Sequence, residues 1–231
     1  MIDDEKRAAA HAAVEEVRPG MLVGLGTGTT TAFAIERLGA LVRAGLDIRA
    51  VATSHRSEAA ARAAGIDLLD FADVAIVDLT IDGADEIDDR LFAIKGAGGA
   101  MLREKIVAAA SRRMIVIADA SKHVARIGRA KLPVEVLPFA RAFVAARLEG
   151  LGARIALRQG YRTDQDNIVI DCIFPEMPDP SALAGYLSAI PGVLGHGLFL
   201  DEVDCAYIGD GDRVIRLESR QPPASPGVRH P

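Results

Sequence analysis

VAIVDLTIDGADEIDDRLFAIKGAGGAMLREK (residues 74–105) ends in the part of the chain in which charge and glycine are most concentrated, residues 82–105. An apolar run, Val74–Ile81, predicts a buried β-strand, and three carboxylates follow it: Asp82, Asp85 and Glu86. Open α/β sheets bind their ligands just beyond the carboxyl ends of the strands. The stretch therefore predicts an α/β fold with an active site at this strand end.

The second half of the same stretch predicts a site for an anionic group. A short apolar run, Leu91–Ile94, ends in Lys95 and the small residues Gly96–Ala100, and a helix over about 101–111 follows. Small residues before a helix let backbone N–H groups approach an anion, and the helix N-terminus adds partial positive charge. Glu104 falls near the start of that helix. The alternative interpretation is a hairpin loop with solvated acids and an amphipathic surface helix.

A second glycine-rich turn has the composition of a phosphate-binding site. Met21–Leu25 predicts a strand, GTGTTT follows at residues 26–31, and Ala32–Leu41 has a helical pattern. Backbone amides and threonine hydroxyls in such a turn can donate to phosphate. The dinucleotide fingerprint GxGxxG would need glycine at Thr29, and a P-loop would need a lysine that the turn lacks. We therefore expect a phosphate site without a nucleotide, the alternative being a purely structural turn.

The composition of the whole chain narrows the class of protein. It has 231 residues, 27 basic and 32 acidic, and a net charge of −5, with no basic patch interleaved with aromatics, so we expect no nucleic-acid partner. The charged start, MIDDEKR, and the lack of any span-length apolar run predict a cytoplasmic protein without membrane association. Cys172 and Cys205 lie in apolar runs and are expected to be buried free thiols. The histidine spacing indicates no metal site.

Repeated strand-then-helix units predict a mainly parallel, Rossmann-like sheet with helices on both faces. Lys6 lies in the first turn of the first helix, and Lys122 lies just past a strand end. The expected helices are Asp3–Val17 and Glu58–Ala64, and the further strands are Asp47–Ala52, Asp67–Phe71 and Met114–Ala118.

A second, smaller domain is expected after a boundary near residues 128–133. Its elements run in the order β-α-β-β-α-β of a ferredoxin-like domain: Leu132–Val136, Phe139–Leu148, Ala153–Leu157, Asn167–Phe174, Pro180–Ala189 and Val193–Phe199. The prediction is a Rossmann-like catalytic domain over 1–128 and 203–220, because Ala206–Ile208 and Val214–Leu217 return to the first sheet. A ferredoxin-like lid domain over 129–202 and a disordered Pro-rich tail over 221–231 complete it.

The motifs of the chain resemble, in order and spacing, the type A family of ribose-5-phosphate isomerases to about residue 218. They are GLGTGTT at 24–30, TS at 53–54, DGADE at 82–86, KGAGGAMLREK at 95–105, ADASK at 118–122, LPVEV at 132–136 and IPGVLGHGLF at 190–199. Thr29 stands where relatives often have serine, and Ala97 replaces a common glycine. Gly195 and His196 also depart from the usual pattern, and we assign them no role.

The resemblance implies a role for each matching residue. Glu104 would be the proton acceptor, with Asp82 and Lys95 also catalytic, and Lys122 would complete the ligand shell. The sugar would be bound by Asp82, Gly83, Ala84 and Asp85 and by Lys95, Gly96, Ala97 and Gly98. The phosphate would be bound by Lys6 and by Thr27, Gly28, Thr29 and Thr30. The family resemblance further implies a small-molecule sugar phosphate as substrate, no metal, no organic cofactor, and a homodimer or homotetramer.

Two other classes of function remain open at this point. A non-catalytic sugar-phosphate sensor can have the same fold, but transcriptional regulators of that kind carry a DNA-binding helix pair, and only some twenty residues precede Met21. An aminosugar-phosphate deaminase or a CoA transferase is the second alternative, although neither is expected to combine KGAGGAMLREK with ADASK.

Overall fold

A computed structural model describes residues 2–219, so the tail expected over 221–231 lies outside the described residues. A seven-stranded sheet forms the larger part, in the order β14-β13-β7-β4-β1-β2-β3. All neighbouring strands in it are parallel except β13 and β14. Its strands are β1 (Leu22–Leu25), β2 (Arg49–Ala52), β3 (Asp67–Leu68), β4 (Leu79–Gly83), β7 (Met114–Asp119), β13 (Cys205–Asp210) and β14 (Arg213–Glu218).

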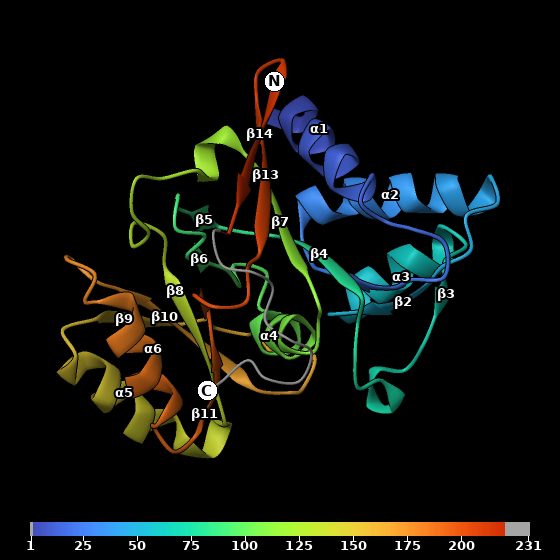
Figure 1. Cartoon of the computed structure of the whole chain (residues 1–231). Coiled ribbons are helices and arrows are strands. Elements are labelled where there is room, and N and C mark those ends of the chain that lie inside the picture. Colours follow the sequence, from blue (N-terminus) through green and yellow to red (C-terminus); the bar gives the residue numbers. More distant parts are fainter. Residues whose placement is uncertain (1, 220–231) are drawn as a thin grey trace.

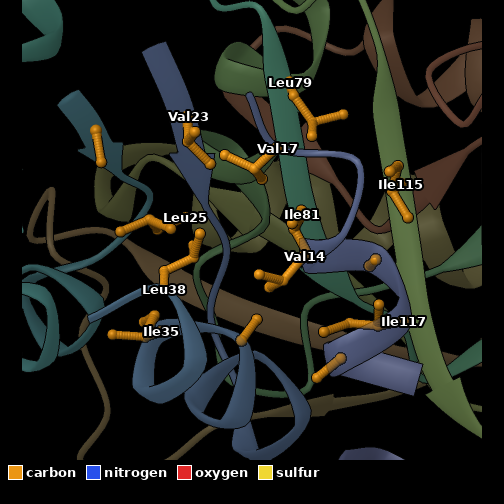
Figure 2. Close-up of a cluster of buried hydrophobic side chains, with 14 of the residues drawn as sticks. Val14, Val17, Val23, Leu25, Ile35, Leu38, Leu79, Ile81, Ile115 and Ile117 are labelled. Carbon is orange, nitrogen blue, oxygen red and sulfur yellow. The ribbon is translucent and has the colours of Figure 1, made fainter. Parts of the chain in front are cut away.

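Alternation of side chains along the strands gives this sheet two buried faces. On β7, Ile115 and Ile117 join the core under α1 (Ile2–Val14), α2 (Thr29–Arg43) and α3 (His55–Ala63). Met114 and Val116 point to the opposite face, where α4 (Met101–Ala109) contributes to the core. Figure 2 shows the first of these cores, with side chains of α1, α2 and the central strands in contact. The expected fold class, a mainly parallel α/β sheet covered on both faces, is confirmed.

A separate antiparallel sheet of four strands forms the smaller part, in the order β11-β8-β10-β9. Its elements are β8 (Leu132–Val136), α5 (Arg141–Gly150), β9 (Arg154–Leu157), β10 (Ile168–Ile173), α6 (Pro180–Ser188) and β11 (Val193–His196). This order is the split βαβ arrangement, and α5 and α6 lie together beside the sheet (Figure 1). The helix α4 contacts both β4 and the strands β8 and β11, so it lies at the junction of the two parts. The domain boundaries themselves stay a prediction.

A third, small sheet was not predicted. Its order is β12-β6-β5, formed by Leu198–Phe199, Ala93–Ile94 and Glu86–Ile87. The predicted strand Val193–Phe199 is therefore divided at Gly197 between two sheets. A Cβ atom at Gly197 would lie 2.2 Å from the carbonyl oxygen of Lys95, so the close approach of the two backbones requires glycine here.

Several predicted elements have the wrong limits. Of the expected strand Val74–Ile81, only the last three residues belong to β4, which begins at Leu79. Val74 and Val77 are apolar because they pack in a small cluster with Val51 and Val107, not because they belong to a strand. The predicted strand Asp67–Phe71 is limited to Asp67–Leu68, and the first helix ends at Val14 rather than Val17.

Candidate active site

The end of β4 and the turn after β1 are joined through one buried carboxylate. Asp82 is fully buried, and its Oδ1 atom accepts hydrogen bonds from the backbone N–H groups of Thr27 (2.9 Å) and Gly83 (2.7 Å). A Cβ atom at Gly26 would lie 1.9 Å from that same oxygen, so only glycine allows the turn to approach Asp82 this closely. The hydroxyl of Thr27 adds a contact to Ser54 Oγ (2.7 Å), which fixes the turn against the start of α3.

Lys95 is the centre of the charged cluster. Its side chain is 2 % exposed, and its Nζ atom lies 2.8 Å from Asp82 Oδ2 and 3.3 Å from Glu104 Oε2. The ammonium also donates to the carbonyl oxygen of Gly83. Burial lowers the pKa of Lys95, but the charges of Asp82 and Glu104 outweigh burial and hold this pKa above its usual value. Lys95 is therefore a permanent cation between two carboxylates.

Glu104, in the first turn of α4, is the carboxylate whose protonation is most altered. It is buried, and the Nζ atom of Lys95 lies 3.3 Å from its Oε2 atom. Burial and the negative charge of Asp82 raise the pKa of Glu104 to about 8, although Lys95 acts in the opposite direction. A carboxyl group with such a pKa can both accept and return a proton near neutral pH.

The glycine loop between β6 and α4 supplies backbone groups beside this cluster. Gly96 and Gly99 have φ angles of 98° and 80°, which other residues adopt only with strain. Asp85 holds the start of the loop, since its Oδ2 atom accepts from Ala97 N at 2.9 Å. The loop is thereby fixed next to Lys95.

A cavity of about 390 Å³ brings most of the predicted site residues together. Glu104 and Lys95 lie on its wall, and Asp82 does not, because Asp82 is buried behind Lys95. The predicted residues on the wall are Lys6, Thr27, Gly28, Thr29, Thr30, Gly83, Ala84, Asp85, Lys95, Gly96, Ala97, Gly98, Glu104 and Lys122. The wall also contains Gly99 and Ala100 of the predicted glycine-rich segment. It further contains residues that were not predicted as site residues: Ser54, Arg56, Asp119, Tyr161 and Asp164.

The wall residues that were not predicted differ in whether the sequence offered a reason to include them. Ser54 and Asp119 lie inside the quoted motifs TS and ADASK and could have been included. Tyr161 and Asp164 belong to the segment between β9 and β10, and no local pattern links that segment to the site. A larger hollow of about 520 Å³ between α3, β3 and α4 contains neither Lys95 nor Glu104, so the smaller cavity is the candidate active site.

Within residues 2–219 no group of three or more His, Cys, Asp or Glu side chains is arranged to hold a metal ion. No helix in the same range has the length and apolar character needed to span a bilayer. The absence of a metal from the reaction stays a prediction.

The mainly parallel sheet is covered by helices on both faces. At its strand ends a lysine lies between two carboxylates, and a glycine loop lies beside them. These features define an α/β protein with an acid–base site for a small polar ligand. The model of the family described as ribose 5-phosphate isomerase A (phosphoriboisomerase A) matches residues 49–213. The chain belongs to this family, which confirms the resemblance found in the sequence.

Similar proteins cover nearly the whole chain. The ribose-5-phosphate isomerase A of Sphingopyxis alaskensis is 55 % identical over 214 residues, which are 91 % of this chain and 94 % of that protein. That of Methanosarcina acetivorans is 48 % identical, covering 94 % and 95 %. Among solved structures, a D-ribose-5-phosphate isomerase in complex with phospho-erythronic acid has a TM-score of 0.91 at 34 % identity, covering 94 % and 99 %. The ribose 5 phosphate isomerase A of Neisseria gonorrhoeae has a TM-score of 0.91 at 38 % identity, covering 96 % and 99 %.

Proposed function

We propose that this protein catalyses the reversible isomerisation of D-ribose 5-phosphate to D-ribulose 5-phosphate, a step of the non-oxidative pentose phosphate pathway. The observation that carries the proposal is the contact of Lys95 with both Asp82 and Glu104 at one side of a cavity whose other walls contain glycine-rich turns. The named relatives are all ribose-5-phosphate isomerases, and none of them favours the alternative of a non-catalytic sensor.

The reaction needs one group that moves a proton between adjacent carbons, and Glu104 is assigned this role. After the furanose ring opens, Glu104 takes the proton from C2 of the open-chain aldose, which leaves a cis-enediolate, and returns the proton at C1 of the ketose. With a pKa of about 8, Glu104 is ionised in a minority of molecules at neutral pH, and this ionised form is the base. A positioned base of this kind contributes about 10² to 10⁴ in rate.

The negative oxygen of the enediolate needs donors, and these are Lys95 and the backbone amides of the glycine loop. Asp82 keeps Lys95 charged and in place through its 2.8 Å contact. The assistance of ring opening that we assign to Asp82 would act through Lys95, because Asp82 lies behind it. Asp85, on the cavity wall, would bind sugar hydroxyls. Removing one donor to such an oxyanion costs on the order of 3 to 4 kcal/mol of transition-state stabilisation.

The phosphate would bind at a second polar region of the wall. Thr27–Thr30 form the turn that leads into α2, where N–H groups at a helix N-terminus favour an anion. Lys6 of α1 and Lys122 of the 3₁₀ turn Ala120–Lys122 add positive charge to the same cavity. Placing the phosphate here leaves the carbon chain to extend towards Lys95 and Glu104.

The deciding experiment is isomerisation of ribose 5-phosphate in deuterated water, with a chelator present, by wild type and Glu104→Gln. We expect chelator-resistant turnover with deuterium at the transferred position in the wild type, and a loss of about 10²- to 10⁴-fold in kcat in Glu104→Gln. Glu149→Gln, at an exposed position of α5, is the matched control and should behave as the wild type. Near-full turnover by Glu104→Gln with substrate still bound would refute the assignment of Glu104.

We also propose that the protein acts in the cytoplasm as a homodimer or homotetramer. Cys172 and Cys205 are both free and buried, as is usual for a protein of a reducing compartment. The family resemblance supports the oligomer. Light scattering of the purified protein tests the oligomeric state, and a monomer would contradict it.

A further inference from the structure

Arg158 connects the smaller part of the protein to the glycine loop. It follows the last residue of β9, and its guanidinium donates to the carbonyl oxygens of Ala97 (Nη1, 2.9 Å) and Gly96 (Nη2, 3.2 Å). Asp171 of β10 holds the guanidinium from behind with two hydrogen bonds, 2.9 Å to Nε and 2.6 Å to Nη2. A bidentate pair of this kind fixes the plane of an arginine side chain.

Tyr161 reaches the next carbonyl of the same loop. Its hydroxyl donates to the carbonyl oxygen of Gly98 at 3.0 Å. A Cβ atom at Gly99 would lie 1.9 Å from this hydroxyl, so the tyrosine occupies space that only glycine leaves free. Three successive carbonyl groups, those of residues 96–98, are thus bonded to side chains from the segment after β9.

Holding the carbonyl groups also orients the amides that follow them. A trans peptide unit is planar, and its C=O and N–H groups point in opposite directions. The amide of Ala97 donates to Asp85, and the amide of Gly99 donates to the carbonyl oxygen of Gly96 at 2.9 Å. The amide of Gly98 has no hydrogen-bond partner among residues 2–219, and Gly98 lies on the cavity wall. The Ala97–Gly98 peptide therefore has its carbonyl bonded to Arg158 and its N–H available to a ligand.

The segment that carries Tyr161 is itself anchored. Glu135 of β8 accepts hydrogen bonds from Thr163 Oγ1 (2.7 Å) and Asn167 Nδ2 (2.9 Å). Asp164 accepts from the backbone N–H of His55, at the start of α3, at 2.8 Å. Because the segment is fixed to both sheets, Arg158 and Tyr161 meet the glycine loop from a rigid support.

We propose that Arg158 and Tyr161, with Asp171 behind Arg158, form a carbonyl clamp that positions the Gly98 amide to donate to the oxyanion of the enediolate. These three are positioning residues, since they act through the glycine loop. The guanidinium charge next to the Ala97 carbonyl also polarises this peptide, which makes its N–H a stronger donor. The inference rests on the proposed isomerase activity. A purely structural role would instead tie the two parts together without any effect on the chemical step.

The two roles are separated by comparing kcat with stability. We expect Arg158→Gln to lower kcat about 10- to 100-fold, part of the effect of losing an oxyanion donor, with KM changed less than about threefold. Arg158→Lys, which keeps the charge and can reach one carbonyl, should recover part of the loss. Tyr161→Phe removes only the hydroxyl and should lower kcat several-fold. The matched control is Arg113→Gln, because Arg113 is similarly paired, with Glu16 (2.8 Å) and Glu218 (2.9 Å), away from the cavity. It should lower the melting temperature and leave kcat within twofold.

Binding of phospho-erythronic acid supplies a readout that does not depend on turnover. Its carboxylate carries negative charge like the enediolate, so Arg158→Gln should weaken its binding, measured by calorimetry, by a factor similar to the loss in kcat. If Arg158→Gln and Tyr161→Phe lose stability but keep kcat and this affinity within twofold, the clamp is wrong. A wild type without isomerase activity would refute the proposed function. The affinity of the variants for phospho-erythronic acid would then still decide on the clamp.

Discussion

At the scale of single residues, the active site contains more buried negative than positive charge. Asp82, Lys95 and Glu104 are all nearly inaccessible to solvent, and one ammonium serves two carboxylates. Transferring a charge out of water costs several kcal/mol unless it is well paired. The pKa of Glu104 is raised by burial and because one ammonium does not balance two buried carboxylates. The same shortage of positive charge raises the basicity of Glu104, as its proposed role as the base requires.

The first prediction is that Glu104→Gln stabilises the protein increasingly with pH. The folded-state pKa of Glu104, about 8, lies above its unfolded value near 4.5. The contribution of Glu104 to the free energy of unfolding is therefore largest below pH 4.5 and is lost as pH rises through 8. The slope is at most about 1.4 kcal/mol per pH unit. Glutamine does not titrate, so the difference between the variant and the wild type in free energy of unfolding should grow from pH 5 to 8 and level off above.

Urea unfolding at pH 5, 6.5, 8 and 9 measures this difference directly. All other titrating groups are shared by the two proteins, so they cancel. Glu149→Gln, on the surface of α5, is the control and should differ from wild type by the same amount at every pH. If the difference in free energy of unfolding between Glu104→Gln and wild type is also independent of pH, the carboxyl group of Glu104 titrates normally in the folded protein.

The sequence allowed many of the site residues to be identified, but it did not indicate which of them reach the cavity wall and which are buried behind it. Strand ends and glycine turns pointed to Lys95 and the loop after it, and the family resemblance assigned Glu104. Nothing in the local sequence indicated that Asp82 lies behind Lys95 rather than on the wall. Arg158 and Tyr161 were missed because they contact residues 61 to 63 positions earlier, and only the tertiary arrangement of the two sheets brings them to the loop.

At the scale of elements, the order of helices and strands was predictable because hydrophobic periodicity follows burial. The prediction failed where a residue is buried without being paired in the expected strand. Val74 and Val77 are packed without belonging to a strand, and Gly197 divides one apolar run between two sheets. A pattern of apolar residues indicates which side chains are buried. It does not indicate which strand the backbone of these residues pairs with.

The contact between α1 and β13 gives the second prediction. A Cβ atom at Gly209 would lie 2.1 Å from the carbonyl oxygen of Glu5, so Gly209→Ala must push the start of α1 away from the sheet. Overpacking of this kind costs about 1 to 3 kcal/mol in free energy of unfolding. Lys6 is the next residue of α1 and lies on the cavity wall, so KM for ribose 5-phosphate should rise as well.

Urea unfolding and steady-state kinetics test both effects together. Gly185→Ala is the matched control, because Gly185 lies in α6 with no atom within 4 Å of the added Cβ, and alanine is the better helix former. This control should be as stable as wild type or more so. If Gly209→Ala loses stability but its KM is unchanged, Lys6 does not contribute to phosphate binding.

At the scale of the whole molecule, the two parts are joined through the active site and through one buried carboxylate. Glu86 of β5 accepts hydrogen bonds from the backbone N–H groups of Gly128 (2.7 Å), Arg129 (3.2 Å) and Ala130 (2.7 Å). These residues lead directly from the larger part into β8. The position of the smaller part, and with it the reach of Arg158 to the glycine loop, therefore depends on both oxygens of Glu86.

The last prediction is that Glu86→Gln loosens this junction. Glutamine replaces one acceptor oxygen with an NH₂ group, which would face a backbone N–H donor and leave it unsatisfied at a cost of about 1 to 3 kcal/mol. We expect lower stability in urea, faster hydrogen exchange of the amides of residues 128–130, and a fall in kcat as Arg158 loses its alignment. Glu86→Asp, which keeps the charge on a shorter side chain, should retain more of each property. If Glu86→Gln exchanges these amides as slowly as the wild type, the junction is held by the packing of α4 between the sheets, and Glu86 is not needed for it.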